Sequence, residues 1–274
     1  MTAHPKVTLV TCKSMPNLFK GEEGLLDELA ARGCDPQIKV WNDPDVDWSE
    51  AGMVVVRSVS DYASDRPAFL EWTKQLRRVQ NSADVLNWNT DKHYLKELAA
   101  LGMPTILTNW LEPEQNLSKH QIHTRFPAFG EFVVKPAVSS GVRDIGRYTT
   151  VDTRQRQAAM RQVQGLLGEG RSVMIQRYVE EIDLHGEISL VFFNGLVSHA
   201  VEKRSALHPA SVSDPAVHEA VVTAEAADSV AWKWGEEIRR VLHGYVRSRL
   251  GHDEQFLFNR VDLVPDGKGS FLVM

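Results

Sequence analysis

The sequence of 274 residues has only two cysteines, Cys12 and Cys34, too few for a disulfide framework or a zinc cluster. It has no run of 18 apolar residues, so we expect no transmembrane helix. Residues 1–6 lead directly into a strand-like run, without the long apolar segment of a signal peptide. These absences predict a protein of the reducing cytoplasm.

Charge of one sign is not in large excess either. The net charge of −5 argues against general affinity for nucleic acid or for an anionic membrane, although a local basic pocket is still allowed. The hydrophobic content of 43% and the charged content of 24% are ordinary for a soluble globular protein. The length suits one large domain or two to three small ones.

The two commonest nucleotide-binding loops are also missing. The chain contains neither Gly-x-x-x-x-Gly-Lys-[Ser/Thr] nor a Gly-x-Gly-x-x-Gly after a predicted strand. Residues 131–141 instead place Lys135 at the end of an apolar strand, followed by a loop of small residues that ends in Gly141. A cation beside a flexible loop suits polyphosphate binding, because backbone N–H groups can approach the oxygens closely. A solvated lysine before a surface turn is the plainer alternative.

Hydrophobic periodicity predicts an α/β protein that is α+β in part. Over the first 85 or so residues, strands at 6–12, 37–41 and 53–57 are interspersed with helices at 22–32 and 69–79, as in a mostly parallel sheet. A helix is predicted at 91–101, and Asn194-Gly195 indicates a β-hairpin. Further helices are predicted at 152–168 and 228–250, a mobile loop at 205–217, and further strands at 132–135, 145–149, 172–179, 187–193, 196–204, 256–264 and 271–274.

Three groups of residues with suitable chemistry follow residue 90. The first is the pair Lys92 and Lys135. The second is a strand that breaks after Val179 and resumes at Glu187, so that free backbone groups can bind an adenine edge and a carboxylate can accept ribose hydroxyls. The third provides cations for phosphates and, in Asp262, a hard oxygen ligand for Mg²⁺; it comprises residues 202–204 and 259–262.

The order and spacing of these groups over residues 89–274 resembles the ATP-grasp superfamily. Segments 55–62, 135–144 and 198–203 resemble its branch of small glutathione-synthetase-like proteins. The resemblance implies an ATP-grasp fold with an N-terminal, mostly parallel α/β domain at 1–88. It further implies a small lid subdomain at 89–178 and a C-terminal antiparallel-sheet subdomain at 179–274.

The resemblance also implies roles for individual residues. Arg260, Lys203 and Arg204 would be catalytic, Asp262 would be the first magnesium ligand, and loops 137–146 and 205–217 would be lids. The residues implied in ATP binding are Lys92, Lys135, Ser139, Ser140, Gly141, Gln176, Arg177, Tyr178, Val179 and Glu187. The second acidic metal ligand of the family would fall at or just past Met274. We therefore expect a metal site that is incomplete within this sequence and a truncated final subdomain.

The implied activity is ATP-dependent C–N ligation with Mg²⁺. A carboxylate of a small amino-acid-like substrate would be activated as an acyl phosphate and attacked by nitrogen. The narrower resemblance implies closure of O-ureido-D-serine to D-cycloserine with release of CO2 and NH3, by a homo-oligomer. An intermolecular carboxylate–amine ligase and a non-catalytic ATP-binding protein of the same fold stay open as alternatives.

Arg57, Ser58 and Asp61 follow three valines at the carboxyl end of a strand, where open α/β sheets bind ligands. We predict that they bind the substrate, with an ordinary strand-end salt bridge as an equal alternative. The other assignments have plainer alternatives too. Lys92 would then be a helix-surface lysine, Glu187 an exposed strand residue and Asp262 a residue of a solvated sheet face. Ser139 and Ser140 would only keep their loop flexible.

Overall fold

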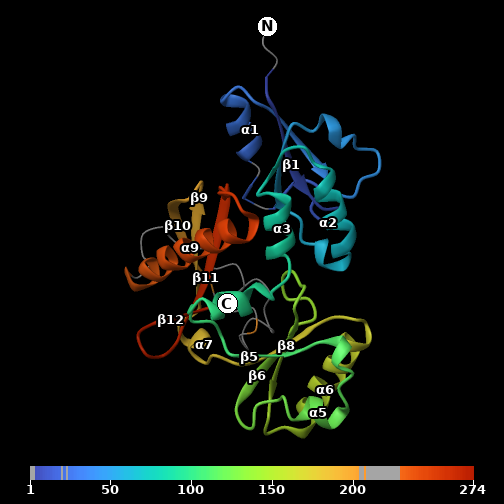
Figure 1. Ribbon diagram of the computed structural model, residues 1–274, viewed down its shortest axis with the longest axis vertical. Coiled ribbons are helices and arrows are strands. Elements are labelled where there is room, and N and C mark those ends of the chain that lie inside the picture. The colour runs from blue at the N-terminus through green and yellow to red at the C-terminus, as the bar shows by residue number, and fades with distance from the viewer. Residues whose placement is uncertain (1–3, 20, 23, 204–206, 208–228) are drawn as a thin grey trace. The chain divides into compact units, whose positions relative to one another are not determined.

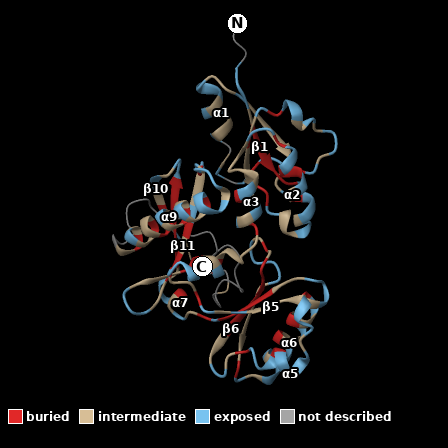
Figure 2. Ribbon diagram, viewed as in Figure 1, coloured by how far each residue is buried: buried red, intermediate tan, exposed pale blue. Residues whose placement is uncertain are grey.

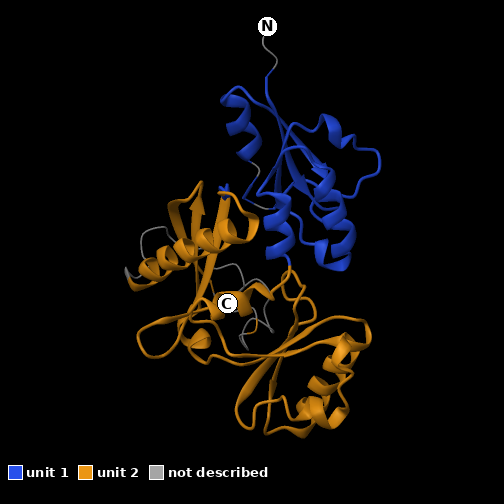
Figure 3. Cartoon of the chain, in the orientation of Figure 1, with its two compact units in different colours: residues 1–90, 254–257 blue, residues 91–253, 258–274 orange. Residues whose placement is uncertain are grey.

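The computed structural model describes residues 4–19, 21, 22, 24–203, 207 and 229–274. The chain forms two compact units (Figure 3). The first unit comprises residues 1–90 and 254–257, and the second comprises 91–253 and 258–274. No helix among the described residues has the length and apolar character needed to cross a membrane.

The first unit is built on a parallel sheet with the strand order β2-β1-β3-β4. Figure 1 labels its strand β1 together with α1, α2 and α3. Its core combines a ring cluster of Trp41, Phe69 and Trp72 with apolar side chains of the central strands. The predicted parallel α/β arrangement is therefore confirmed. The elements are β1 (Lys6–Thr11), α1 (Gly24–Ala31), β2 (Asp35–Val40), β3 (Met53–Ser58), α2 (Arg66–Gln75), β4 (Val79–Gln80) and α3 (Ala83–Asn89), with short 3₁₀ turns at Trp48–Glu50 and Tyr62–Ser64.

The second unit contains two antiparallel sheets, the first with the order β5-β8-β6-β7. Its elements are α4 (Tyr94–Ala100), β5 (Thr108–Leu111), a 3₁₀ turn at Pro113–Gln115, α5 (Lys119–His123), β6 (Glu131–Pro136), β7 (Gly146–Thr149), α6 (Thr153–Gly168) and β8 (Val173–Arg177). Buried residues of α6, such as Ala159 and Val163, pack against Phe132 and Val134 of β6. Figure 2 shows this buried face of the sheet beneath α5 and α6.

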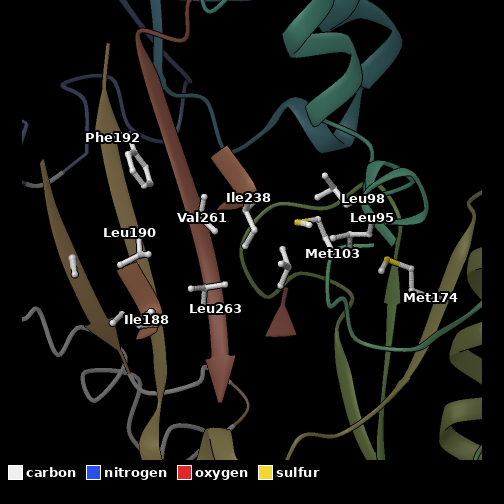
Figure 4. Close-up of a cluster of buried hydrophobic side chains, with 13 residues drawn as sticks. Leu95, Leu98, Met103, Met174, Ile188, Leu190, Phe192, Ile238, Val261 and Leu263 are labelled. Carbon is white, nitrogen blue, oxygen red and sulfur yellow. The ribbon is translucent and has the colours of Figure 1, made fainter. Parts of the chain in front are cut away.

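The second sheet of this unit has the order β10-β9-β11-β12. Asn194 and Gly195 both have positive φ, 53° and 76°, which confirms the predicted hairpin between β9 and β10. Ile238 of α9 packs on Leu190 and Val261 in the core shown in Figure 4. The elements are α7 (Glu181–His185), β9 (Glu187–Phe193), β10 (Leu196–Lys203), α9 (Ser229–Leu250), β11 (Phe258–Pro265) and β12 (Phe271–Val273).

Two predicted helices have different limits in the structure. The helix predicted at 69–79 ends at Gln75, because the chain becomes extended at Leu76 and Val79 then pairs with Val54 of β3. The helix predicted at 91–101 begins only at Tyr94, because the preceding residues turn around the carboxylate of Asp91. Both differences lie at element ends, where local propensity competes with tertiary pairing.

Candidate active site

One face of the second antiparallel sheet carries charged residues. Ile188 and Leu263 point into the core, so their neighbours along each strand point to the opposite face. The register pairs Glu187 with Lys203 and places Ser189 opposite Asp262. Arg260, two residues before Asp262, lies on the same face. The strand alternation therefore gathers these five side chains on one surface.

Asp262 is the centre of this group. Its carboxylate accepts a hydrogen bond from the Ser189 hydroxyl at 2.6 Å, and its two oxygens lie 2.8 Å from Nε and Nη2 of Arg260. Partial burial opposes ionisation, but the charges of Arg260 and Lys203 prevail and lower the pKa of Asp262. Lys203 Nζ also lies 3.3 Å from Glu187. Asp262 is therefore an ionised carboxylate held in a fixed orientation.

Lys135 and Lys92 add two cations from the other sheet and from the start of α4. Burial lowers the pKa of Lys135 to about 8, even though the charge of Glu187 acts in the opposite direction. Burial and then the charge of Lys135 lower the pKa of Lys92 to about 8 as well. The two lysines thus lie close enough to repel each other. Such a pair is costly without an anion between its members.

The loop after β6 is attached at both ends. Lys92 Nζ donates to the hydroxyl and the carbonyl oxygen of Ser139, at 2.7 and 3.1 Å. At the other end, Arg171 donates to the Asp144 carboxylate at 2.8 Å. Between these anchors Gly141 is exposed and has φ of 61°, while Ser140 is half-buried. The loop thus presents its backbone to solvent next to the lysine pair.

The predicted break in the strand is present and β9 starts at Glu187 as expected, but β8 ends at Arg177 rather than at Val179, and α7 separates it from β9. Gln176 is buried and donates to the Thr108 hydroxyl at 2.8 Å. The backbone N–H of Tyr178 donates to Glu131, and the Tyr178 ring lies 3.6 Å beneath the Arg147 guanidinium. Arg177 lies over the Phe129 ring. Val179 packs at the edge of an apolar cluster of Ile106, Val133, Tyr178, Ile182 and Val264.

A cavity of about 450 Å³ opens beside Glu187. It is lined by α7, by Glu202 of β10 and by the turn that joins β11 to β12. Glu187 is one of the residues that line it. Of the predicted catalytic residues, Arg204 lies outside the described residues. The predicted second lid at 205–217 also lies outside them, apart from Leu207.

The residues of the charged face could hold a magnesium ion through the Asp262 carboxylate together with oxygens of a bound phosphate. Magnesium in phosphoryl-transfer sites is usually held by one or two carboxylates together with substrate phosphates and water. Asp262 offers such a carboxylate on the charged face. Within the described part of the chain, no cluster of three or more acidic, histidine or cysteine side chains provides an all-protein cage. A metal at Asp262 would therefore need phosphate oxygens to complete its coordination.

The predicted substrate residues lie in the first unit and have neighbours of their own. Arg57 forms a half-buried ion pair with Glu22, and the Ser58 hydroxyl donates to the same carboxylate at 2.6 Å. Asp61 accepts a hydrogen bond from the indole of Trp41 at 2.8 Å. The strand-end salt bridge that the sequence left open is therefore present, and substrate binding by these residues stays a prediction.

Paired substitutions separate the two roles of Arg57. Arg57→Ala should raise KM for the amino-acid substrate about tenfold and leave KM for ATP unchanged, because a charged hydrogen bond to the substrate is lost. Glu22→Gln is the matched control, since it removes the ion pair but keeps the guanidinium. Steady-state kinetics with each substrate varied would check this. Equal effects of both variants on KM would show that Arg57 serves only the salt bridge.

Sequence reasoning missed Ser189, His93 and Glu112. Ser189 lies two residues after Glu187 in a strand, so the period of two could have placed it on the same face. His93 contacts Asp91 and Glu112, and the latter is 19 residues away along the chain. No local sequence pattern predicts a contact between residues so far apart.

Comparisons with known proteins agree with this geometry. Residues 7–87 match the family described as "D-cycloserine synthetase DcsG, N-terminal domain". The chain is 32% identical over 258 residues to the cycloserine biosynthesis protein DcsG of Streptomyces lavendulae, covering 91% of this chain and 83% of that protein.

Solved structures give the same picture. The crystal structure of D-cycloserine synthetase DcsG superposes with a TM-score of 0.80 at 30% identity, over 98% of this chain and 89% of that one. D-alanyl-alanine synthetase A from Vibrio cholerae superposes with a TM-score of 0.65 at 14% identity, over 100% of this chain and 88% of the other. The second likeness shows a shared fold, and the predicted ATP-grasp architecture is confirmed.

Proposed function

The chain belongs to the D-cycloserine synthetase (DcsG) family of ATP-grasp ligases, and from that premise we propose that it closes O-ureido-D-serine to D-cycloserine. It is an ATP-dependent ligase. The observation that carries the proposal is the charged group of the second unit, in which Lys203 pairs with Glu187, Arg260 pairs with Asp262, and Lys135 and Lys92 add two further cations. Their positive excess complements the charge that a magnesium-bound nucleoside triphosphate retains.

In the proposed complex, Lys92, Lys135 and the 137–146 loop hold the phosphates. Glu187 accepts hydrogen bonds from the ribose hydroxyls, and backbone groups of residues 176–179 bind the adenine edge. Asp262 would hold Mg²⁺, which would neutralise charge on the phosphoryl oxygens. Arg260 and Lys203 stabilise the charge that develops during phosphoryl transfer. Because Arg260 already pairs with Asp262, the arginine and the metal site are positioned together.

The first step forms a bond between a carboxylate oxygen of the substrate and the γ-phosphorus of ATP. The bond from that phosphorus to the β,γ-bridging oxygen breaks, and ADP results. The ureido nitrogen that is bonded to oxygen then attacks the acyl carbon, loses its proton and expels phosphate. Hydrolysis of the carbamoyl group finally consumes water and releases CO2 and NH3.

The ring-closing step needs little help from the protein beyond shape. Nucleophile and electrophile belong to one molecule, so their effective concentration is already high. The protein mainly has to keep water away from the acyl phosphate. We assign this role to the exposed part of the loop between Ser139 and Asp144, which Lys92 and Arg171 anchor at its two ends.

The test is release of ADP by the purified protein with MgATP, measured with and without O-ureido-D-serine. We expect ADP and phosphate only with that substrate, together with D-cycloserine identified by mass spectrometry. ADP release that requires a separate amine would favour the intermolecular ligase. Nucleotide binding by calorimetry without turnover on any amino acid would favour the non-catalytic protein.

A further inference from the structure

His93 lies between two carboxylates at the entry to α4. Its Nδ1 is 2.6 Å from the Asp91 carboxylate, and its Nε2 is 3.0 Å from the Glu112 carboxylate, just after β5. The ring also stacks on Trp110, with ring centroids 4.6 Å apart. Lys96 of α4 reaches the same Glu112 oxygen at 3.0 Å. The imidazole thus connects the start of α4 to the end of β5.

This geometry requires the charged form of the ring. A neutral imidazole has one N–H donor and one lone pair, so one of the two carboxylates would face a lone pair. The imidazolium donates to both. The charged groups around the ring are Asp91 on its own segment, Glu112 after β5, and Lys96 of α4, which shares the Glu112 oxygen with the ring. The pKa of His93 is raised by its hydrogen bonds to Asp91 and Glu112, against the effect of burial. The connection is therefore complete only when His93 is protonated.

The residue before His93 is Lys92. The backbone N–H of Lys92 donates to the Ala137 carbonyl at 3.0 Å, and its ammonium group donates to Ser139. Asp91, which precedes Lys92, accepts from both the ring and the backbone N–H of His93. Lys92 therefore belongs to a three-residue turn that the Asp91–His93–Glu112 contacts hold rigid.

We propose that His93, as the imidazolium between Asp91 and Glu112, is a positioning residue that fixes Lys92 against the phosphate-binding loop. This inference rests on the proposed role of Lys92 in ATP binding. The side chain of His93 contacts Asp91, Glu112 and Trp110, and the proposal assigns it no contact with ATP or the reacting atoms. Its effect should appear in nucleotide affinity more than in the rate of the chemical step, because a displaced Lys92 weakens ground-state and transition-state binding alike.

The first measurement is ATP affinity of His93→Gln near pH 6. We expect Kd and KM for ATP to rise about tenfold, as for loss of a charged hydrogen bond, with a smaller change in kcat. His120→Gln, an exposed histidine of α5, is the matched control and should bind ATP like the wild type. His93→Arg keeps a permanent cation with several donors and should restore most of the affinity.

The second measurement tests whether the effect depends on protonation of the His93 ring. A double-mutant cycle of His93→Gln and Glu112→Gln should give a coupling in ATP affinity of about tenfold near pH 6. Because the pKa of His93 is raised in the folded protein, this coupling is present below the ordinary histidine pKa and is lost as the pH rises through the raised value. It should be gone at pH values well above that raised pKa. Because the pKa of Lys92 is itself about 8, the loss of coupling is assigned to His93 only if it follows the titration of the His93 ring measured by NMR.

An NMR titration of the histidine ring protons provides a readout without nucleotide. The signal missing from the His93→Gln spectrum should titrate above the ordinary histidine range in the wild type and move down in Glu112→Gln. A normal ring pKa, or a cycle with no coupling near pH 6, would overturn the inference. Lys92→Met separates the two proposals. If it leaves ATP affinity intact, the ATP site itself is wrong; if it abolishes binding while His93→Gln has no effect, only the positioning role fails.

Discussion

Replacing Lys135 with methionine should greatly reduce ATP turnover and at the same time make the folded protein more stable. The lysine is only 8% exposed and its pKa is lowered to about 8, so its positive charge is unfavourable in the folded protein without a ligand. Methionine fills a similar volume with no charge. Removing one preorganised donor from a phosphoryl-transfer site costs about 10²–10³ in rate. The expected result is a large loss of kcat with a gain in unfolding temperature.

The gain in stability has a predicted size and pH dependence. A shift from 10.5 to about 8 corresponds to roughly 3 kcal/mol, as an upper estimate. Between these two pH values the unfolded state binds more protons than the folded state, so the stability of the wild type rises with pH. The difference between wild type and Lys135→Met should therefore be largest below pH 8 and shrink toward pH 10.5. Thermal unfolding over a pH series measures it.

Lys119→Met is the matched control, because Lys119 is an exposed lysine at the start of α5. It should change neither turnover nor the pH dependence of unfolding. A folded Lys135→Met protein with normal ATP turnover would contradict the assignment of the phosphate site. A variant that is less stable than the wild type at neutral pH would show instead that the lysine charge is well compensated in the free protein.

Asp262→Asn should lower turnover by about 10²-fold or more and raise the Mg²⁺ concentration required for half-maximal rate. Asparagine keeps the shape and can still accept the hydrogen bond from Ser189, but it loses the charge that pairs with Arg260 and would hold the metal. The measurement is the initial rate at saturating ATP over a magnesium titration.

Ser189→Ala is the companion variant, because it leaves the Asp262 charge intact and removes only the hydrogen bond that orients it. Its loss of rate should be about tenfold, with a small change in the magnesium requirement. An Asp262→Asn protein whose magnesium dependence matches the wild type would show that Asp262 serves Arg260 alone. The proposed metal ligand would then have to be sought elsewhere.

Much of the fold could be predicted because the spacing of hydrophobic residues determines most of the helices and strands. The Val54–Val56 run of β3, the Asn194-Gly195 turn and the Gly251 that ends α9 are local signals that tertiary structure did not override. The short strand β5 was missed, because four residues reading TNWL have no clear alternation. It forms because β8 offers it a partner, with Thr108 opposite Gln176.

The site was predicted less completely, and the reason is physical. Strand alternation places Glu187, Lys203 and Asp262 on one face, and this follows from the sequence once the register is known. The contacts of Arg57 with Glu22 and of His93 with Glu112 join segments that no periodicity relates. Such pairs arise from packing, so the sequence could suggest the chemistry of each residue but not the neighbour that holds it.

The low pKa of Lys92 and Lys135 also bears on how the enzyme avoids damaging itself. A lysine with a pKa of about 8 holds a share of neutral amine at mildly alkaline pH, and a neutral amine is a nucleophile. The acyl phosphate of the proposed reaction is an electrophile that such an amine would attack, which would leave the lysine acylated. Nucleotide phosphates bound at the proposed site would raise the pKa of both side chains and keep them as unreactive ammonium groups. A nucleotide retained until the ring has closed would then act as a protecting group for the two lysines.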